Sequence, residues 1–376
     1  MRIFLLMLWA SSSAVAFAPL FVRPFFSSAI TSAKISEGST WSSYDTAVLR
    51  SVDSRVCVVE SDDFKMESIE LASKLSLDLV PKEMIFDSRA SVDSSRWGYS
   101  LLLEPFCISN VDENKTYALS IQPLHNELSK QKRRPSKQKR KASPVKPFFV
   151  DFSPPLGSRL GKRLSGGEDL LVKAAGPRKG VFAEEGAIVY DLTAGFGQDA
   201  LLLANAGAAK VVMFERNPIV GALLQDALRR LGSLANSLDD IDGSMQQGVS
   251  LLSDQLFVEI GDGQQMLAER FSHLVNEHGR CDIVYLDPMF PTRTKSAAVK
   301  KNMQILHGLL ESQTIDGSAR QQEECTMLET ALQAASNRVV VKRPVGAPVL
   351  GGPDTATKPS YQIKGSVNRW DVYSLL

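Results

Sequence analysis

The sequence is poor in the residues that build metal centres and disulfide frameworks. Its 376 residues include 4 cysteines and 4 histidines, and the histidines are dispersed along the chain. No two cysteines have the C-x-x-C spacing of a zinc ribbon or a redox motif, so the sequence predicts neither structural disulfides nor a metal site. The cysteines are Cys57, Cys107, Cys281 and Cys325.

The sequence also lacks an excess of either charge. It has 43 basic and 42 acidic residues, which excludes an acidic tail protein and a uniformly basic, histone-like protein. One segment departs from this balance, because residues 130–146 contain nine Lys or Arg and no acid. Its Pro, Ser and Gln content predicts a disordered insertion over residues 128–147. Such an insertion is either an arm that contacts nucleic-acid phosphates or a solvated segment without a task.

No hydrophobic run near the N-terminus reaches the roughly 20 residues that a membrane-spanning helix needs. The apolar residues 3–9, preceded by Arg2 and followed by Ala14-Val15-Ala16, predict a signal peptide over residues 1–16. The Ser-rich, acid-poor stretch that follows predicts a transit peptide over residues 17–50. The junction Ala16-Phe17 resembles that of bipartite plastid presequences in algae. We therefore expect a plastid protein, with the mitochondrion or the secretory pathway as alternatives.

The remaining chain divides at the basic insertion. Residues 51–127 predict a small α+β lobe, with strands at 56–59, 99–103 and 117–121 and a helix within 66–79. Strands and helices alternate over residues 148–376, which predicts a doubly wound, mostly parallel α/β sheet whose ligands bind at the carboxyl ends of the strands. The expected strands are 188–191, 210–215, 256–260, 282–286 and 338–342, the expected helices are 199–206, 218–231 and 323–335, and 362–366 with 370–373 form a closing hairpin.

A glycine motif follows the first strand of this sheet. Gly195 and Gly197 allow a tight turn and close approach of a ligand to the backbone, a spacing that also fits a dinucleotide site. Acids at the ends of successive strands favour another cofactor. Asp191 suits a cationic amino-acid group, Glu215 the ribose hydroxyls, and Asp262 an adenine amine or simply a turn. Three acids suit S-adenosylmethionine, which carries a sulfonium and an ammonium, better than a phosphate-rich ligand.

A second motif, Asp287-Pro288-Met289-Phe290-Pro291, ends the fourth strand. It resembles the Asp/Asn-Pro-Pro-Tyr/Phe motif of amino methyltransferases. An aromatic amine is a poor nucleophile because its lone pair is delocalised into the ring. Asp287 and a carbonyl near Pro288 would accept its N–H groups, and Phe290 would stack on the base. These three residues are the predicted catalytic residues.

Basic residues surround this second motif and predict a phosphate-lined approach to it. A solvated helix face remains the alternative for the two adjacent lysines, Lys300 and Lys301. The predicted RNA-binding residues are Arg293, Lys295, Lys300, Lys301, Lys342 and Arg343.

Several motifs together resemble the ribosomal RNA small subunit methyltransferase J family. They are Val150-Asp151-Phe152, residues 191–199, Glu215-Arg216-Asn217-Pro218, residues 286–291, Lys295-Ser296-Ala297, residues 339–344 and Arg369-Trp370-Asp371-Val372-Tyr373. The resemblance implies a Rossmann-like class I SAM-dependent methyltransferase that modifies guanine N2 in small-subunit rRNA or a pre-ribosomal particle. It places cofactor contacts on Gln198, Asp199, Glu215, Arg216, Asp262, Gly263 and Asp287. The family usually has Arg in place of Gln198 and a Ser pair in place of Asp262-Gly263.

Other functions fit parts of the same pattern. An adenine-N6 or protein-glutamine methyltransferase would use the same amine motif, an NAD-dependent oxidoreductase would use the glycine motif, and a non-catalytic RNA-binding module would need neither. The sequence indicates no obligate protein partner and no membrane association of the mature form.

Overall fold

The computed structural model describes the chain in segments: residues 55–86, 97–106, 116–124, 146–153, 162–164, 169–176, 186–237, 251–288, 305–306, 308–309, 317–352 and 357–375. The predicted signal and transit peptides lie outside them, as does all of the basic run except Lys146. Within the described part of the chain, no helix combines the length and the apolar character needed to cross a membrane.

The small N-terminal lobe is a four-stranded mixed sheet with the order β2-β1-β3-β4. Strand β1 (Val56–Val59) pairs parallel with β2 (Asp78–Val80) and β3 (Tyr99–Phe106), and β3 pairs antiparallel with β4 (Thr116–Pro123). Helices α2 (Lys65–Leu75) and α3 (Lys82–Phe86) complete the lobe. The predicted helix within 66–79 was wrong at its C-terminal end. Ser76 takes a left-handed conformation with φ 52°, which ends α2 and frees the following residues to form β2.

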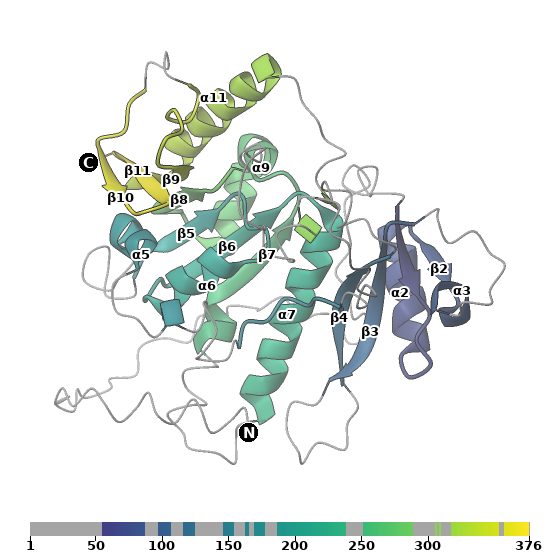
Figure 1. Ribbon diagram of the computed structural model, residues 1–376. Helices are drawn as coiled ribbons and strands as arrows, with labels where there is room; N and C mark the ends of the chain where they lie inside the picture. Colours follow the sequence, from purple (N-terminus) through teal and green to yellow (C-terminus); the bar gives the residue numbers. More distant parts are fainter. Residues whose placement is uncertain are drawn as a thin grey trace, which may run out of the picture.

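The larger sheet has seven strands in the order β10-β11-β9-β8-β5-β6-β7, and the five from β9 to β7 are parallel (Figure 1). This confirms the predicted doubly wound sheet. The predicted bounds of β5, β6 and β7 are confirmed residue for residue, and the closing hairpin pairs antiparallel. The strands are β5 (Ile188–Asp191), β6 (Lys210–Glu215), β7 (Leu256–Ile260), β8 (Ile283–Leu286), β9 (Arg338–Pro344), β10 (Tyr361–Lys364) and β11 (Asn368–Ser374).

Helices cover both faces of this sheet, and alternate strand residues face them. In β9, Val340 joins the hydrophobic cluster that contains residues of α5, α6 and α7, whereas Val339 and Val341 join the cluster that contains residues of α9 and α11. The sequence pattern did not predict α5 and α9. The helices are α5 (Leu170–Ala175), α6 (Gln198–Asn205), α7 (Pro218–Ser237), α9 (Gly263–His278) and α11 (Gly317–Ala334).

Helix α7 joins the small lobe to the larger sheet (Figure 1). Its Asp226 is fully buried and accepts a hydrogen bond from the main-chain N–H of Leu119 in β4 at 2.9 Å. Arg229 and Arg230 donate to the same carboxylate at 2.7 and 2.8 Å, so its charge is compensated. Arg229 also donates to the Tyr117 carbonyl, and a single hydrophobic cluster includes residues of both parts.

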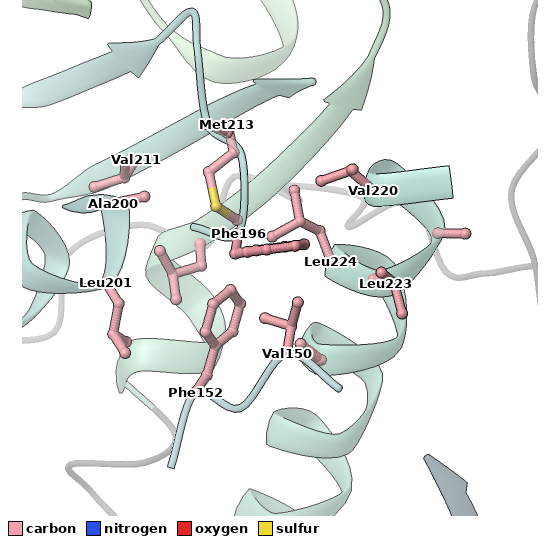
Figure 2. Packing of buried hydrophobic residues seen from close by; sticks show 14 of the residues in the cluster. Val150, Phe152, Phe196, Ala200, Leu201, Val211, Met213, Val220, Leu223 and Leu224 are labelled. Carbon is pink, nitrogen blue, oxygen red and sulfur yellow. The ribbon is translucent and has the colours of Figure 1, made fainter. Parts of the chain in front are cut away.

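A compact apolar cluster lies beneath the glycine motif. Figure 2 shows Phe196 between Met213 and Leu224, with Phe152 and Val150 on the other side of its ring. Gly197 has φ +67°, and a Cβ built there would lie 2.9 Å from Phe152 Cζ. Glycine is therefore needed at this position both for the backbone conformation and for the packing.

Candidate functional site

The predicted site residues gather where β5 and β8 lie side by side. From β5 the chain continues outward through β6 and β7, and it then returns to β8 and β9 on the other side. This reversal makes β5 and β8 the point at which the strand order changes direction, and doubly wound sheets bind ligands outside the carboxyl ends of the strands at such a point. Asp191 ends β5, and Asp287 directly follows β8.

The glycine turn after β5 is held by two carboxylates. The Thr193 N–H donates to Asp191 Oδ1 at 3.1 Å, and the Gly195 N–H donates to Glu215 Oε2 at 2.8 Å. Gly195 has φ +53°, a conformation that side-chain-bearing residues rarely adopt. The turn is thus fixed before any ligand arrives.

Glu215 lies buried at the end of β6. Its Oε1 accepts the Asn217 N–H at 2.8 Å, so each carboxylate oxygen receives one main-chain donor and keeps a lone pair for another. Burial raises the pKa of Glu215 to about 7, although the hydrogen bonds from Asn217 and Gly195 oppose the rise. A carboxylate held in this way suits a pair of ribose hydroxyls.

The remaining cofactor predictions fall on the rim of this turn. Asp262 caps α9 and accepts the Gln265 N–H at 3.1 Å, and Gly263 leaves no room for a Cβ, which would lie 2.9 Å from Phe214 Cβ. Arg216 pairs with Glu323 of α11 at 3.3 Å. Gln198 is exposed at the start of α6. The structure therefore gives Asp262, Gly263 and Arg216 local structural roles, and their contacts with the cofactor stay predictions.

A second cluster of charges lies around Asp287, the first residue of the motif 287–291, which is called the amine motif below. Lys342 Nζ lies 2.7 Å from Asp287 Oδ2 and 2.7 Å from Asp199 Oδ2. Asp199 also accepts the Tyr285 hydroxyl at 2.8 Å and Arg163 Nη1 at 3.1 Å. The Asp199 carboxylate is therefore engaged through both oxygens by groups of the protein itself.

The surroundings of these carboxylates set their pKa values in different directions. Burial raises the pKa of Asp191 to about 8, helped by the charges of Asp199 and Asp287. Burial also acts to raise the pKa of Asp199, but Lys342 and Arg163 outweigh it and hold that pKa at about 2. Partial burial raises the pKa of Asp287, and Lys342 opposes this rise. The Asp287 and Asp199 carboxylates raise the pKa of Lys342 despite its burial.

The structure changes the interpretation of two predicted RNA contacts. The Arg343 side chain is 1% exposed and donates to Glu324 of α11 and to the Pro348 carbonyl. A guanidinium buried in this way does not reach an RNA phosphate, which corrects the prediction for Arg343. Lys342 turns inward to the carboxylates. Phe290, Arg293, Lys295, Lys300 and Lys301 lie outside the described residues.

Three residues that form hydrogen bonds in the site were not among the site residues predicted from the sequence. Thr193 accepts a hydrogen bond from the Asp287 N–H, Tyr285 donates to Asp199, and Arg163 links Asp199 to Asp169. A polar hydroxyl within the apolar strand 283–286 was a usable signal for Tyr285. Arg163 carried no such signal, because only the fold brings it to Asp199.

Comparison with known proteins identifies the family. A family model described as putative SAM-dependent methyltransferase matches residues 108–375. The ribosomal RNA small subunit methyltransferase J of Salmonella newport is 36% identical over 290 residues, which cover 77% of this chain and 93% of that protein. The protein of the same name from Neisseria meningitidis serogroup B is 38% identical over 225 residues, 60% of this chain and 75% of that protein.

A solved structure resembles the chain as well. It is the crystal structure of a SAM-dependent methyltransferase from Neisseria gonorrhoeae, with 25% identity, a TM-score of 0.49, and coverage of 85% of this chain and 95% of that one.

The residues present fit the cofactor that the family requires. Asp191, Glu215 and Asp287 bring carboxylates to the carboxyl ends of three adjacent parallel strands. Carboxyl oxygens at these positions suit a ligand whose ribose hydroxyls and ammonium donate hydrogen bonds, whereas a pyrophosphate offers only acceptors. The family match decides between the two cofactors that the glycine motif left open. The chain belongs to the ribosomal RNA small subunit methyltransferase J family of Rossmann-like methyltransferases, and its cofactor is S-adenosylmethionine.

Proposed function

We propose that this enzyme methylates the exocyclic N2 of a guanine in small-subunit rRNA. One observation carries the proposal: the amine acceptor Asp287 is joined to the cofactor turn by a 2.6 Å hydrogen bond from its main-chain N–H to Thr193 Oγ1. The acceptor and the turn are therefore adjacent at the carboxyl ends of β5 and β8, as direct transfer of a methyl group requires. The names of the relatives from Salmonella and Neisseria support rRNA as the substrate.

In the proposed reaction, Glu215 and Asp191 bind the cofactor, and Asp287 accepts a proton from the substrate amine. Glu215 would hold the ribose hydroxyls, and Asp191 would face the cationic part of the cofactor. When bound, S-adenosylmethionine would supply a methyl group made electrophilic by its sulfonium, and the C–S bond would break as the N–C bond forms. The attacking nitrogen then carries one proton in excess, and the Asp287 carboxylate accepts that proton or passes it to water.

Asp287 also makes the amine more reactive before the transfer. The guanine amino lone pair is delocalised into the ring, and an N–H bond to the carboxylate favours a rotated amine whose lone pair is available. Positioning of this kind supplies most of the rate enhancement in a one-step displacement. The Pro288 ring fixes the backbone after Asp287 and removes a competing N–H donor.

The substrate must present an unpaired base. The N2 amine of guanine is hydrogen-bonded within a paired helix, so the base must lie in a single-stranded region or flip out, at a cost of a few kcal/mol. When such a base reaches Asp287, the surrounding phosphates remain outside the site. The predicted cations Arg293, Lys295, Lys300 and Lys301 follow the amine motif in the sequence and are proposed to meet those phosphates.

The decisive experiment compares acceptors. We expect the purified enzyme to transfer labelled methyl groups to small ribosomal subunits or their rRNA, and nuclease digestion with mass spectrometry to identify N2-methylguanosine. Asp287→Ala should abolish transfer at saturating cofactor while the protein still unfolds cooperatively, which excludes a non-catalytic RNA-binding module. N6-methyladenosine as the product, or methylation of a glutamine peptide alone, would contradict the proposal.

We also propose that the enzyme works in the plastid. The support is the predicted signal peptide over residues 1–16 and the predicted transit peptide over 17–50. A fusion of residues 1–50 to a fluorescent protein should accumulate in plastids. Secretion, or import into mitochondria, would contradict this proposal without affecting the proposed reaction.

A further inference from the structure

Strand β9 places Lys342 next to the amine motif. It pairs parallel with β8, with Leu286 opposite Val341, so Lys342 and Asp287 are the next residues along the two strands. The Lys342 ammonium lies between two carboxylates, at 2.7 Å from Asp287 Oδ2 and 2.7 Å from Asp199 Oδ2. Its side chain is 19% exposed, whereas that of Asp287 is 39% exposed.

Lys342 thus bridges the carboxylates of Asp287 and Asp199, and the Asp199 carboxylate is held by further groups. Asp199, in the first turn of α6, is held by the Tyr285 hydroxyl from β8 and by Arg163. Arg163 is held in turn by Asp169, the N-cap of α5, at 2.7 Å. Several elements therefore hold Asp199 in place. Because Lys342 bonds both carboxylates, its contact with Asp199 restricts the position of Asp287 as well.

The bridge matters more to Asp287 than to Asp199. Asp199 has Arg163 and Tyr285 as further partners. Among the residues that the structure describes, Lys342 is the only side chain that bonds the Asp287 carboxylate. It engages Oδ2, which leaves Oδ1 for another donor. Without the ammonium, Asp287 would lose its orientation and face the charge of Asp199 unscreened.

We propose that Lys342 is a positioning residue for methyl transfer, which fixes the Asp287 carboxylate so that its Oδ1 receives the substrate amine. The inference rests on the proposed function for the identity of that amine. It assigns the cation of the motif Val341-Lys342-Arg343 to the reaction rather than to the RNA backbone. A charged, directional hydrogen bond of this kind is well suited to hold a carboxylate in one orientation.

The ammonium has a second consequence for Asp287. It favours the ionised carboxylate, the form that accepts an N–H, against partial burial and the neighbouring acid. The groups that interact electrostatically with Lys342 or Asp287 are Asp199 of α6, Asp191 of β5, Tyr285 of β8 and Arg343 of β9, and Arg163 acts on Asp199. Of these, Asp199 stays ionised and Tyr285 stays neutral across the pH range of an assay.

The test uses Lys342→Met, which keeps an unbranched side chain one atom shorter and removes its charge, and Lys342→Arg, which keeps the charge. We expect Lys342→Met to lower kcat by roughly 100-fold, because small displacements of a catalytic group have effects of that size. The cofactor Kd from calorimetry should change less than about threefold. The acidic limb of the plot of kcat against pH should move to higher pH by about one unit, because loss of the Lys342 charge raises the pKa of Asp287. Lys342→Arg should restore part of kcat and return the limb towards its original position.

The matched control is Lys173→Met, the same substitution at an exposed position of α5. It should leave kcat and the pH profile unchanged. A Lys342→Met enzyme with wild-type kcat, or one that loses activity with an unshifted pH profile and no rescue by arginine, would overturn the proposal.

A measurement without substrate separates this inference from the proposed function. Carboxyl-carbon NMR of the cofactor-free protein should show Asp287 titrating at a higher pH in Lys342→Met than in the wild type, with Lys173→Met unchanged. If the wild type fails to methylate rRNA, the proposed function fails while this titration still tests Lys342. If the midpoint of Asp287 does not move, the positioning role fails whatever the substrate is.

Discussion

The main-chain N–H of Asp287 donates to Thr193 Oγ1 at 2.6 Å. Thr193 belongs to the glycine turn after β5, and Asp287 follows β8. The hydrogen bond therefore connects the glycine turn to Asp287 between β5 and β8, where the strand order of the sheet reverses. A shift of the glycine turn would therefore move Asp287, the proposed amine acceptor.

Removal of this tie should impair catalysis with little change in the fold. Thr193→Val keeps the shape of the side chain and leaves the Asp287 N–H unpaired, a loss of about 1–3 kcal/mol. We expect the single-turnover methylation rate to fall by about 10-fold or more. Thr193→Ser, which keeps the hydroxyl, should stay close to the wild type. Equal rates for the two variants would show that the hydrogen bond does not matter.

Glu215 should contribute to cofactor affinity. Its buried carboxylate receives two main-chain donors and retains lone pairs, which we propose accept the ribose hydroxyls. Glu215→Ala should weaken S-adenosylmethionine binding by roughly 1–3 kcal/mol, measured by calorimetry. Glu269→Ala, at an exposed position of α9, is the control and should bind normally. Unchanged affinity of the Glu215 variant would mean that the ribose lies elsewhere.

The stability of the cofactor-free protein should fall as the pH rises from about 5 to 8. Burial raises the pKa of Asp191 to about 8 and that of Glu215 to about 7, whereas both groups titrate near pH 4 in the unfolded chain. The folded state thus binds protons that the unfolded state has lost, and this stabilisation is complete below pH 4 and is lost as the pH passes through the folded pKa values. Each group contributes a slope of up to about 1.4 kcal/mol per pH unit.

The measurement is urea unfolding at several pH values between 5 and 9. Asp191→Asn should make the decline shallower by about the slope of one group. Asp199 does not contribute in this range, because its pKa is held at about 2 by Lys342 and Arg163 despite its burial. A variant that shows the full wild-type decline would contradict the assignment of Asp191.

The contact between the small lobe and α7 should be costly to break. Asp226→Ala leaves Arg230 buried without its carboxylate and the Leu119 N–H without an acceptor. Loss of one partner of a buried ion pair typically destabilises a protein by about 3–5 kcal/mol. Urea unfolding should show a loss of this size, whereas Asp62→Ala, an exposed position in the small lobe, should be neutral. A loss below about 1 kcal/mol would mean that the contact is not a stabilising one.

The basic run of residues 130–146 should act through salt-dependent contacts with phosphates. Its deletion should weaken RNA binding and flatten the dependence of affinity on salt concentration. Binding of the free cofactor should stay unchanged. An unaltered salt slope would identify the run as a passive insertion.

The sequence by itself determined the order of strands and helices in the larger sheet and the position of the two motifs. Apolar runs such as 188–191 and 210–215 are bounded by turns and acids, so their ends are encoded locally. Local pattern was less informative where a single residue ended an element. The left-handed Ser76 closes α2, although the apolar spacing continues to Leu79, and β2 forms by pairing with β1.

Only the tertiary structure decided what the adjacent cations Lys342 and Arg343 do. In the sequence they are equivalent and predict one basic patch. Successive side chains of a strand point to opposite faces of the sheet, so Lys342 reaches Asp199 of α6 while Arg343 reaches Glu324 of α11. The partners come from helices that are distant in the sequence and lie on opposite faces. Their roles therefore depend on which helix covers which face, and a linear pattern does not contain that information.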